Sequence, residues 1–315
     1  MAVSGSTDFS LNRDEVIDKS LELLGVKEAT ITPSAAEVTQ AASWLNLMLK
    51  EWQVATQNSL WVRKTGTLYL ESNKVSYNLG TGVYAATGTT YETTTDTAHI
   101  ATDTVIGVTL TPWAAASGSI GILLDDGTIH WTTITGYVGD TSYTIAAGLP
   151  SAAASGNKVY VYTNVAHRPQ KIMEAVLRNS SNNDTPLEFI SQSEYMEISD
   201  KGQSGTPSLL YLDMQLGDAV LYPWPKQDSN DTQIIYKYIK HYDDMDASTD
   251  DLEFPVEWTM AIIYGLAMHL ANVYAVDEEV YARIARTASL TFKRANNYDI
   301  EDTSIEFEPD PSEMR

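Results

Sequence analysis

This chain offers few histidine or cysteine side chains for catalysis or metal binding, the two roles that these residue types often have. Five histidines occur in 315 residues, and none has a partner three or four residues away. Zinc sites typically draw on ligands at such spacings, so we expect no zinc centre. The chain has no cysteine, which excludes disulfides, thiolate nucleophiles and cysteine-ligated metals. The histidines are His99, His130, His167, His241 and His269.

No arrangement typical of a hydrolase or a nucleotide-binding enzyme is present. There is no Gly-x-Ser-x-Gly motif, and Gly80-Thr81-Gly82 lacks the third glycine and the helix of a nucleotide cradle. Carboxylate pairs such as Glu253 and Glu257 can cleave glycosides, but 42 acidic residues produce such pairs by chance. The acidic run at 243–251 lacks the glycine and spacing of a calcium loop, which favours a solvated loop. We therefore expect no catalytic, cofactor-binding or metal-binding residues, and we interpret the chain as a non-enzyme.

Aromatic and basic side chains are the more informative groups. The segment Tyr222-Pro223-Trp224-Pro225 is a stiff strand end with a large contact surface, so Tyr222 and Trp224 are candidates for either ordinary packing or an interface. Near the other end, Arg283, Arg286 and Arg294 share one face of an expected helix at about 100° per residue. These arginines point away from the apolar side of that helix, and we interpret them as interface candidates.

The last segment, residues 299–315, is acidic and punctuated by prolines. It contains seven acids and one base, and we expect it to be extended or disordered in the free chain. Ile300, Ile305 and Phe307 are its anchor candidates for a groove on a partner, while its acids would meet a basic surface such as the arginine face.

The overall charge constrains the partners. The formal net charge is −22, with 42 acidic and 20 basic residues. Such a chain should repel free nucleic acid, because affinity for phosphates depends on Lys and Arg; the simpler interpretation of the acidity is solubility. The first residues have no basic patch or apolar run, so no secretion signal is expected. The uncharged segment 258–276 is interpreted as a buried core helix rather than a membrane span, because it contains His269 and Asn272.

Periodicity predicts an α+β fold. Capping boxes at Asn12 and Ser34 open two helices that form a hairpin over residues 12–56. A β hairpin is expected over 68–79, and residues 83–163, rich in Thr, Ala and Gly, are expected to form an inserted β-sandwich or barrel-like module. Residues 168–246 are strand-rich, and two helices close the chain, beginning near residues 255 and 277.

These elements predict that the chain is organised in three structural parts. The N- and C-terminal helix pairs should form a helical bundle that, with the mixed β region, makes a core from residues 1–82 and 164–298. The module at 83–163 would be inserted into that core, and the acidic segment 299–315 would form an extended tail. Small residues at four-residue spacing in the first C-terminal helix, such as Ala261 and Gly265, should let another helix approach closely.

The order of these elements, with several short motifs, resembles the head-to-tail adaptor proteins of short-tailed bacteriophages, also called tail accessory factors or head-completion proteins. The resemblance covers residues 10–80 and 164–300. The motifs are Leu49-Lys50-Glu51-Trp52-Gln53, Leu70-Glu71-Ser72-Asn73-Lys74-Val75-Ser76-Tyr77-Asn78-Leu79-Gly80, Arg168-Pro169-Gln170-Lys171-Ile172, Gly205-Thr206-Pro207, Leu221-Tyr222-Pro223-Trp224-Pro225 and Leu252-Glu253-Phe254-Pro255-Val256-Glu257-Trp258.

The resemblance implies a structural virion protein made in the bacterial host cytoplasm. It implies a ring, usually of twelve subunits, that binds the portal protein on one side and the tail nozzle or tail tube on the other. Such a ring retains the packaged genome and gives DNA a channel during ejection, without tight DNA binding and without a membrane. No cofactor and no catalytic residue is implied.

Two alternatives from other classes remain open. The Thr-rich β module with Trp113 and Trp131 could belong to a secreted carbohydrate-binding protein. The acidic pairs could belong to a cell-wall glycosidase. The module at 83–163 is also the main departure from the resemblance, because the simplest adaptor proteins lack it.

Overall fold

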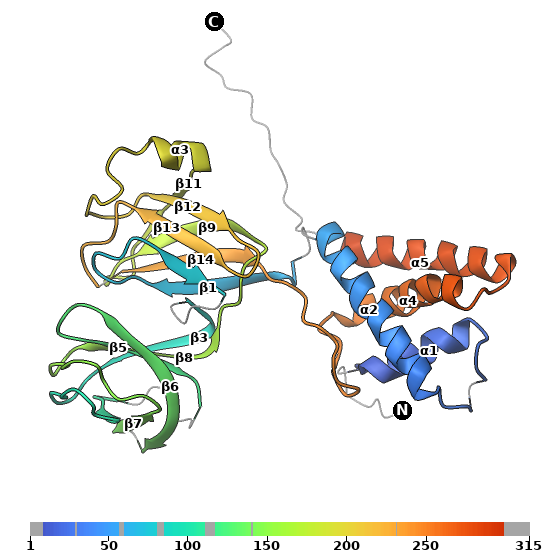
Figure 1. The fold of residues 1–315 in the computed structure, drawn as a ribbon, viewed down its shortest axis with the longest axis horizontal. Coiled ribbons are helices and arrows are strands. Elements are labelled where there is room, and N and C mark those ends of the chain that lie inside the picture. Colours follow the sequence, from blue (N-terminus) through green and yellow to red (C-terminus); the bar gives the residue numbers. More distant parts are fainter. Residues whose placement is uncertain are drawn as a thin grey trace, which may run out of the picture. The chain divides into compact units, whose positions relative to one another are not determined.

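The computed structural model of this protein describes residues 9–28, 30–56, 60–80, 85–110, 117–139, 141–230 and 232–298. Those residues form a mixed α+β protein that is rich in strands (Figure 1). The chain divides into two compact units: unit 1 is Met1–Val62 with Tyr242–Arg315, and unit 2 is Arg63–His241. This division differs from the predicted boundaries at 82 and 164.

Unit 1 contains the helices from both ends of the chain. They are α1 (Arg13–Leu23), α2 (Ala35–Ala55), the short 3₁₀ helix η1 (Val256–Trp258), α4 (Thr259–Val273) and α5 (Glu278–Tyr298).

The predicted capping boxes of unit 1 are confirmed. At α1, the Glu15 amide donates to Asn12 Oδ1 at 2.9 Å, and the Asn12 amide donates to Glu15 Oε2 at 3.0 Å. At α2, Ser34 and Glu37 exchange the same pair of bonds, at 2.8 and 3.3 Å. Each box satisfies amides that the helix itself cannot pair, which fixes where the helix begins.

Helix α4 is the centre of unit 1. It contacts α1, α2 and α5, and eight of its residues are buried. Gly265 faces α2: a Cβ there would lie 2.7 Å from the Trp52 ring and 2.9 Å from the Met48 sulfur. This confirms that the small residue permits a close helix approach. Within the described residues, no helix is long and apolar enough to cross a membrane.

Aromatic rings complete the core of unit 1. The Phe292 ring of α5 makes edge contacts with Trp52 at 4.8 Å and with Trp258 at 5.6 Å, measured between ring centroids. Trp61 stacks on Tyr242 at 5.1 Å and packs on Phe254 at 4.6 Å. The rings therefore join residues from both ends of the chain into one core.

The described residues of unit 2 form two sheets. The larger has ten strands in the order β10-β9-β14-β1-β3-β8-β5-β6-β7-β4, and the smaller has four in the order β11-β12-β13-β2. The bounds are β1 (Arg63–Tyr69), β2 (Tyr77–Leu79), β3 (Ala85–Thr94), β4 (Val105–Gly107), β5 (Ser119–Leu123), β6 (Ile129–Val138), β7 (Ser142–Ile145), β8 (Lys158–Val165), β9 (Lys171–Arg178), β10 (Asp184–Pro186), β11 (Glu188–Phe189), β12 (Leu209–Met214), β13 (Ala219–Trp224) and β14 (Gln233–Ile239), with helix α3 (Gln192–Glu197) after β11.

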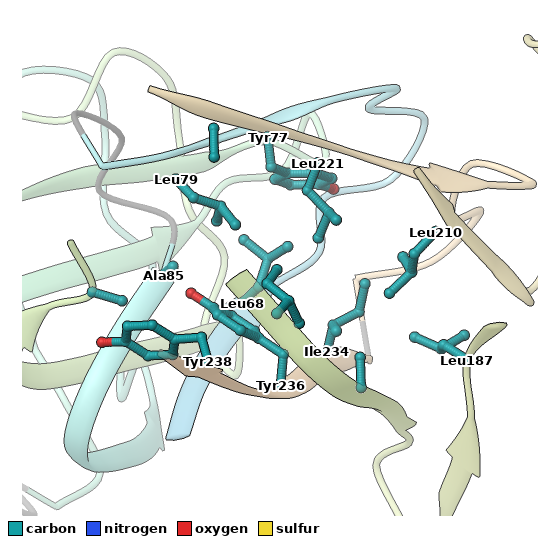
Figure 2. Close-up of a cluster of buried hydrophobic side chains, with 14 of the residues drawn as sticks. Leu68, Tyr77, Leu79, Ala85, Leu187, Leu210, Leu221, Ile234, Tyr236 and Tyr238 are labelled. Atoms are coloured by element: carbon teal, nitrogen blue, oxygen red, sulfur yellow. The ribbon is translucent and has the colours of Figure 1, made fainter. Parts of the chain in front are cut away.

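One apolar core lies between the two sheets. Figure 2 shows Leu68, Ile234 and Tyr236 of the larger sheet with Leu79 and Leu221 of the smaller sheet in one interior. This arrangement makes the predicted β hairpin over 68–79 wrong, because β1 pairs with β14 and β3, whereas β2 pairs with β13. The turn after β1 carries the chain from one sheet to the other, so that both strands bury side chains in the shared core.

A second core lies in the segment predicted as an inserted module. Strands β3 to β8 surround a cluster of buried aliphatic side chains and Tyr143. The bridge between Thr95 and Val108 links the end of β3 to the segment after β4, which closes the strand order β3-β8-β5-β6-β7-β4 into a barrel-like ring. The strands of this segment agree with the prediction that it is a β module.

We predict that residue 265 tolerates no large side chain. Gly265→Leu should lower the free energy of unfolding by about 1–3 kcal/mol through overpacking against Trp52 and Met48, although Leu is the better helix former. Thermal and urea melts of the variant and of wild type measure this change in the free energy of unfolding. Gly217→Leu is the control, because a Cβ there meets nothing within 4 Å, and its stability should stay within about 0.5 kcal/mol of wild type. Equal effects of the two changes would contradict the prediction.

We also predict that residues 83–163 fold by themselves. They have their own core, although β3 pairs with β1 through only three residue pairs and Tyr69 of β1 packs on Tyr160. The isolated fragment should show a β-type circular dichroism spectrum and a cooperative melt. A random-coil fragment, together with an unfolded remainder of the chain, would show that the boundary is misplaced.

Candidate interaction surfaces

The orientation of α5 is fixed by its inner face. Ile284, Ala288 and Ala295 are buried, and Phe292 contacts the aromatic core of unit 1. Tyr281 is 37% exposed. It lies in the first turn of the helix.

The opposite face of α5 is basic. Arg283, Arg286 and Arg294 are all exposed, as the helical spacing predicts, and so is Lys293, which the sequence-based candidates did not include. Leu290 lies among them and is 49% exposed. Across the described residues, none of these four cations makes an ion pair. We call these four cations with Leu290 the basic face; its role as an interface stays a prediction.

A second charged surface in unit 1 is the acidic loop, defined here as residues 243–251. Its backbone is held on α2, because the Tyr242 amide donates to Gln53 Oε1 at 3.2 Å and the Met245 amide donates to Asn46 Oδ1 at 2.9 Å. Lys50 forms an ion pair of 2.7 Å with Asp244. The loop is thus a structured surface and not a solvated run alone.

Several acidic residues of this loop are exposed. Among them are Asp243, Asp246 and Asp251, whereas the Asp250 carboxylate accepts a hydrogen bond of 2.7 Å from the Ala247 amide. An open groove of about 420 Å³ runs along the loop and is lined by Leu49, Tyr242, Asp243, Asp244, Met245, Asp250, Asp251, Glu253 and Phe254. Nowhere in the described ranges do three or more His, Asp or Glu residues gather as a metal site. With Asp243, Asp244, Asp250, Asp251 and Glu253 in its lining, the groove is acidic and complementary in charge to a basic surface.

The aromatic candidates of unit 2 pack within their own unit. Tyr222 stacks with Tyr211 and Tyr195, with ring centroids 5.7 and 5.3 Å apart, and the Trp224 indole donates to the Asp200 carbonyl at 2.9 Å. Both candidates remain partly exposed. These contacts favour the packing interpretation, and an interface role stays a prediction. Ile300, Ile305 and Phe307, with the whole segment 299–315, lie outside the described residues, as does Trp113.

A small polar cavity lies in unit 2. Its volume is about 140 Å³, and its lining includes Tyr69, Glu92, Lys158, Tyr160 and Arg178. Typical ligand pockets measure about 300–1,000 Å³. Arg178 is already committed to Asp184 through two hydrogen bonds of 2.7 Å. The cavity has room for water or one small polar group.

His99 is buried and has partners on both ring nitrogens. The Gly107 amide donates to Nε2 at 3.1 Å, and the Asp103 carboxylate lies 3.4 Å from Nδ1. These contacts hold the loop after β3 against β4. The arrangement serves the fold of the module, in which the histidine joins two segments of the chain.

Comparisons with known proteins add little to this geometry. No family model matches the chain, and no curated protein matches it. Among solved structures, VP17, a capsid protein of bacteriophage P23-77, aligns with 8% sequence identity and a TM-score of 0.11, over 60% of this chain and 78% of VP17. A score this low assigns neither a fold nor a function.

We predict that Glu71 makes stability depend on pH. This side chain is buried after β1, and burial raises the pKa of its carboxyl, partly offset by Lys74 at 3.1 Å and by the Trp131 indole. The folded chain therefore holds the proton more tightly than the unfolded chain. The resulting stabilisation is complete at low pH and is lost as pH rises through the folded pKa.

Comparing Glu71→Gln with wild type tests this sign. The variant should be at least as stable as wild type at pH 7, and wild type should gain on it as pH falls toward 4, measured by thermal melts. Glu188→Gln, on an exposed position, is the control. A stability difference between wild type and Glu71→Gln that does not change with pH would rule out the titration of Glu71.

Proposed function

We propose that this chain is a structural subunit of the neck of a tailed bacteriophage, where a ring of copies, twelve by the resemblance, joins the portal protein to the tail. The observation that carries the proposal is the composition of unit 1. Helices α1, α2 and α5, from the two ends of the chain, contact α4 within one unit. These contacts support the helix pairs that the adaptor resemblance implies.

The surfaces of unit 1 support an assembly role. A ring subunit needs two different surfaces, one for each neighbour. Unit 1 offers the basic face of α5 and the acidic loop, each held on a rigid element. Unit 2, which has its own cores, would then make the contacts with the portal or the tail nozzle, or face the outside of the neck.

The net charge supports a passive relation to DNA. With −22 charges, the chain lacks the excess of cations that counterion release requires. DNA in the proposed channel would pass without tight binding, and duplex DNA should bind the purified chain with a Kd above about 1 µM at physiological salt.

The two alternative functions predict different experimental results. A carbohydrate-binding protein would retain glycans on an array, and a glycosidase would release sugars from cell walls.

Particle imaging tests the proposal. We predict that the purified chain, mixed with the portal protein of the same phage, forms a ring seen by electron microscopy, and that antibody label on intact particles lies at the junction of head and tail. A chain that stays monomeric and never binds the portal, or label found elsewhere on the particle, would refute the neck assignment.

A further inference from the structure

The basic face of α5 is an anomaly in an acidic chain. Four of the chain's 20 basic residues lie exposed on this one helix, which carries no acid after Glu279. Exposed cations this close together repel one another. Leu290, which lies between them on the helix face, adds an exposed apolar side chain. Within the described residues nothing of the same subunit pairs with them. A surface of this composition suits an acidic partner.

The acidic loop lies on the other side of α2 from α5. Asn46, Lys50 and Gln53, which hold the loop, fall within about 60° of one another on α2. Met48, which faces Gly265 of α4, lies roughly opposite them on the wheel. Trp52 is also turned toward α4 and α5, where it meets Phe292.

The two charged surfaces of one subunit are therefore kept apart. Phe292 is on the inner face of α5, so the basic face points away from α2 and from the loop beyond it. In Figure 1, α5 and the orange segment that leads into α4 lie on different sides of α2. Opposite charges on opposite sides of one rigid unit satisfy the requirement for a head-to-tail contact between copies.

We propose that the basic face of α5 binds the acidic loop of a second copy of this chain. The inference rests on the proposed function and names the contact that builds the ring. Arg283, Arg286 and Arg294 would face Asp243, Asp246 and Asp251 of the neighbour, with Leu290 at the centre. Exposed pairs are individually weak, so the contact depends on several together and weakens as salt rises.

Charge reversal in two complementary variants tests the contact. Variant one is Arg283→Glu with Arg286→Glu and Arg294→Glu. Variant two is Asp243→Lys with Asp246→Lys and Asp251→Lys, which leaves the Lys50–Asp244 pair intact. Self-association of the full chain is measured by sedimentation at about 50 mM salt, where the Debye length is about 14 Å, with and without portal. Each variant alone should associate at least about tenfold more weakly than wild type.

Mixing the two variants is the decisive step. In an alternating arrangement every interface again pairs opposite charges, so the mixture should regain association toward the wild-type level. The control reverses three exposed lysines of unit 2 that belong to neither surface, Lys64→Glu with Lys171→Glu and Lys237→Glu, which changes the net charge as variant one does. The control should associate like wild type, apart from the general effect of net charge.

The outcomes separate this inference from the neck assignment. If wild type forms rings but the variants also form them, or the mixture gains nothing, the contact is wrong and the neck role stands. If truncation after Tyr298 weakens association as variant one does, the acidic segment 299–315 is the occupant of the basic face, and the loop is not. If wild type never associates, alone or with portal, the contact and the proposed ring both fail.

Discussion

Gly265 allows the backbone of α4 to touch the side chains of α2, and the arrangement of unit 1 depends on that approach. With no Cβ in the way, Trp52 and Met48 reach α4 directly, and Trp52 then meets Phe292 of α5. Because interiors are close-packed, a side chain at this position would displace the Trp52 ring that Phe292 contacts. The inner face of α5 packs on these rings, so its arginines lie on the opposite, exposed face. Packing in the interior thereby determines charge placement on the surface.

Local signals in the sequence predicted the elements whose causes are local. The capping boxes at Asn12 and Ser34 need only residues three positions apart, and the structure contains both. The aliphatic strands of the module were also predictable, because their alternation is strong. Strand β3 (Ala85–Thr94) was missed, since its Thr and Gly residues show little alternation, and its pairing with β8 stabilises it from a distance. The hairpin over 68–79 failed for the same reason: sheet membership is decided by partners far along the chain.

The candidate surfaces divide in a similar way. The exposure of Arg283, Arg286 and Arg294 follows from 3.6 residues per turn, so the sequence could place them on one face. It could not show that the run at 243–251 is held on α2, because that depends on Gln53 and Asn46, nearly two hundred residues away. Composition alone favoured a solvated loop. Whether any surface binds a partner depends on a second molecule, which no pattern in one chain contains.

The separation of charge has a consequence for DNA in the proposed ring. If the cations of α5 are covered by acidic loops of neighbouring copies, the basic side chains most able to bind phosphate are no longer exposed on the channel wall. The surface that remains carries the excess of acids that the net charge of −22 requires. DNA binding by counterion release needs exposed cations on the protein, and this wall would have too few of them. A DNA duplex would then pass along a wall that repels it. The same contact would thus hold the ring together and keep its channel free of adhesion, so subunit affinity and DNA passage would depend on salt in linked ways.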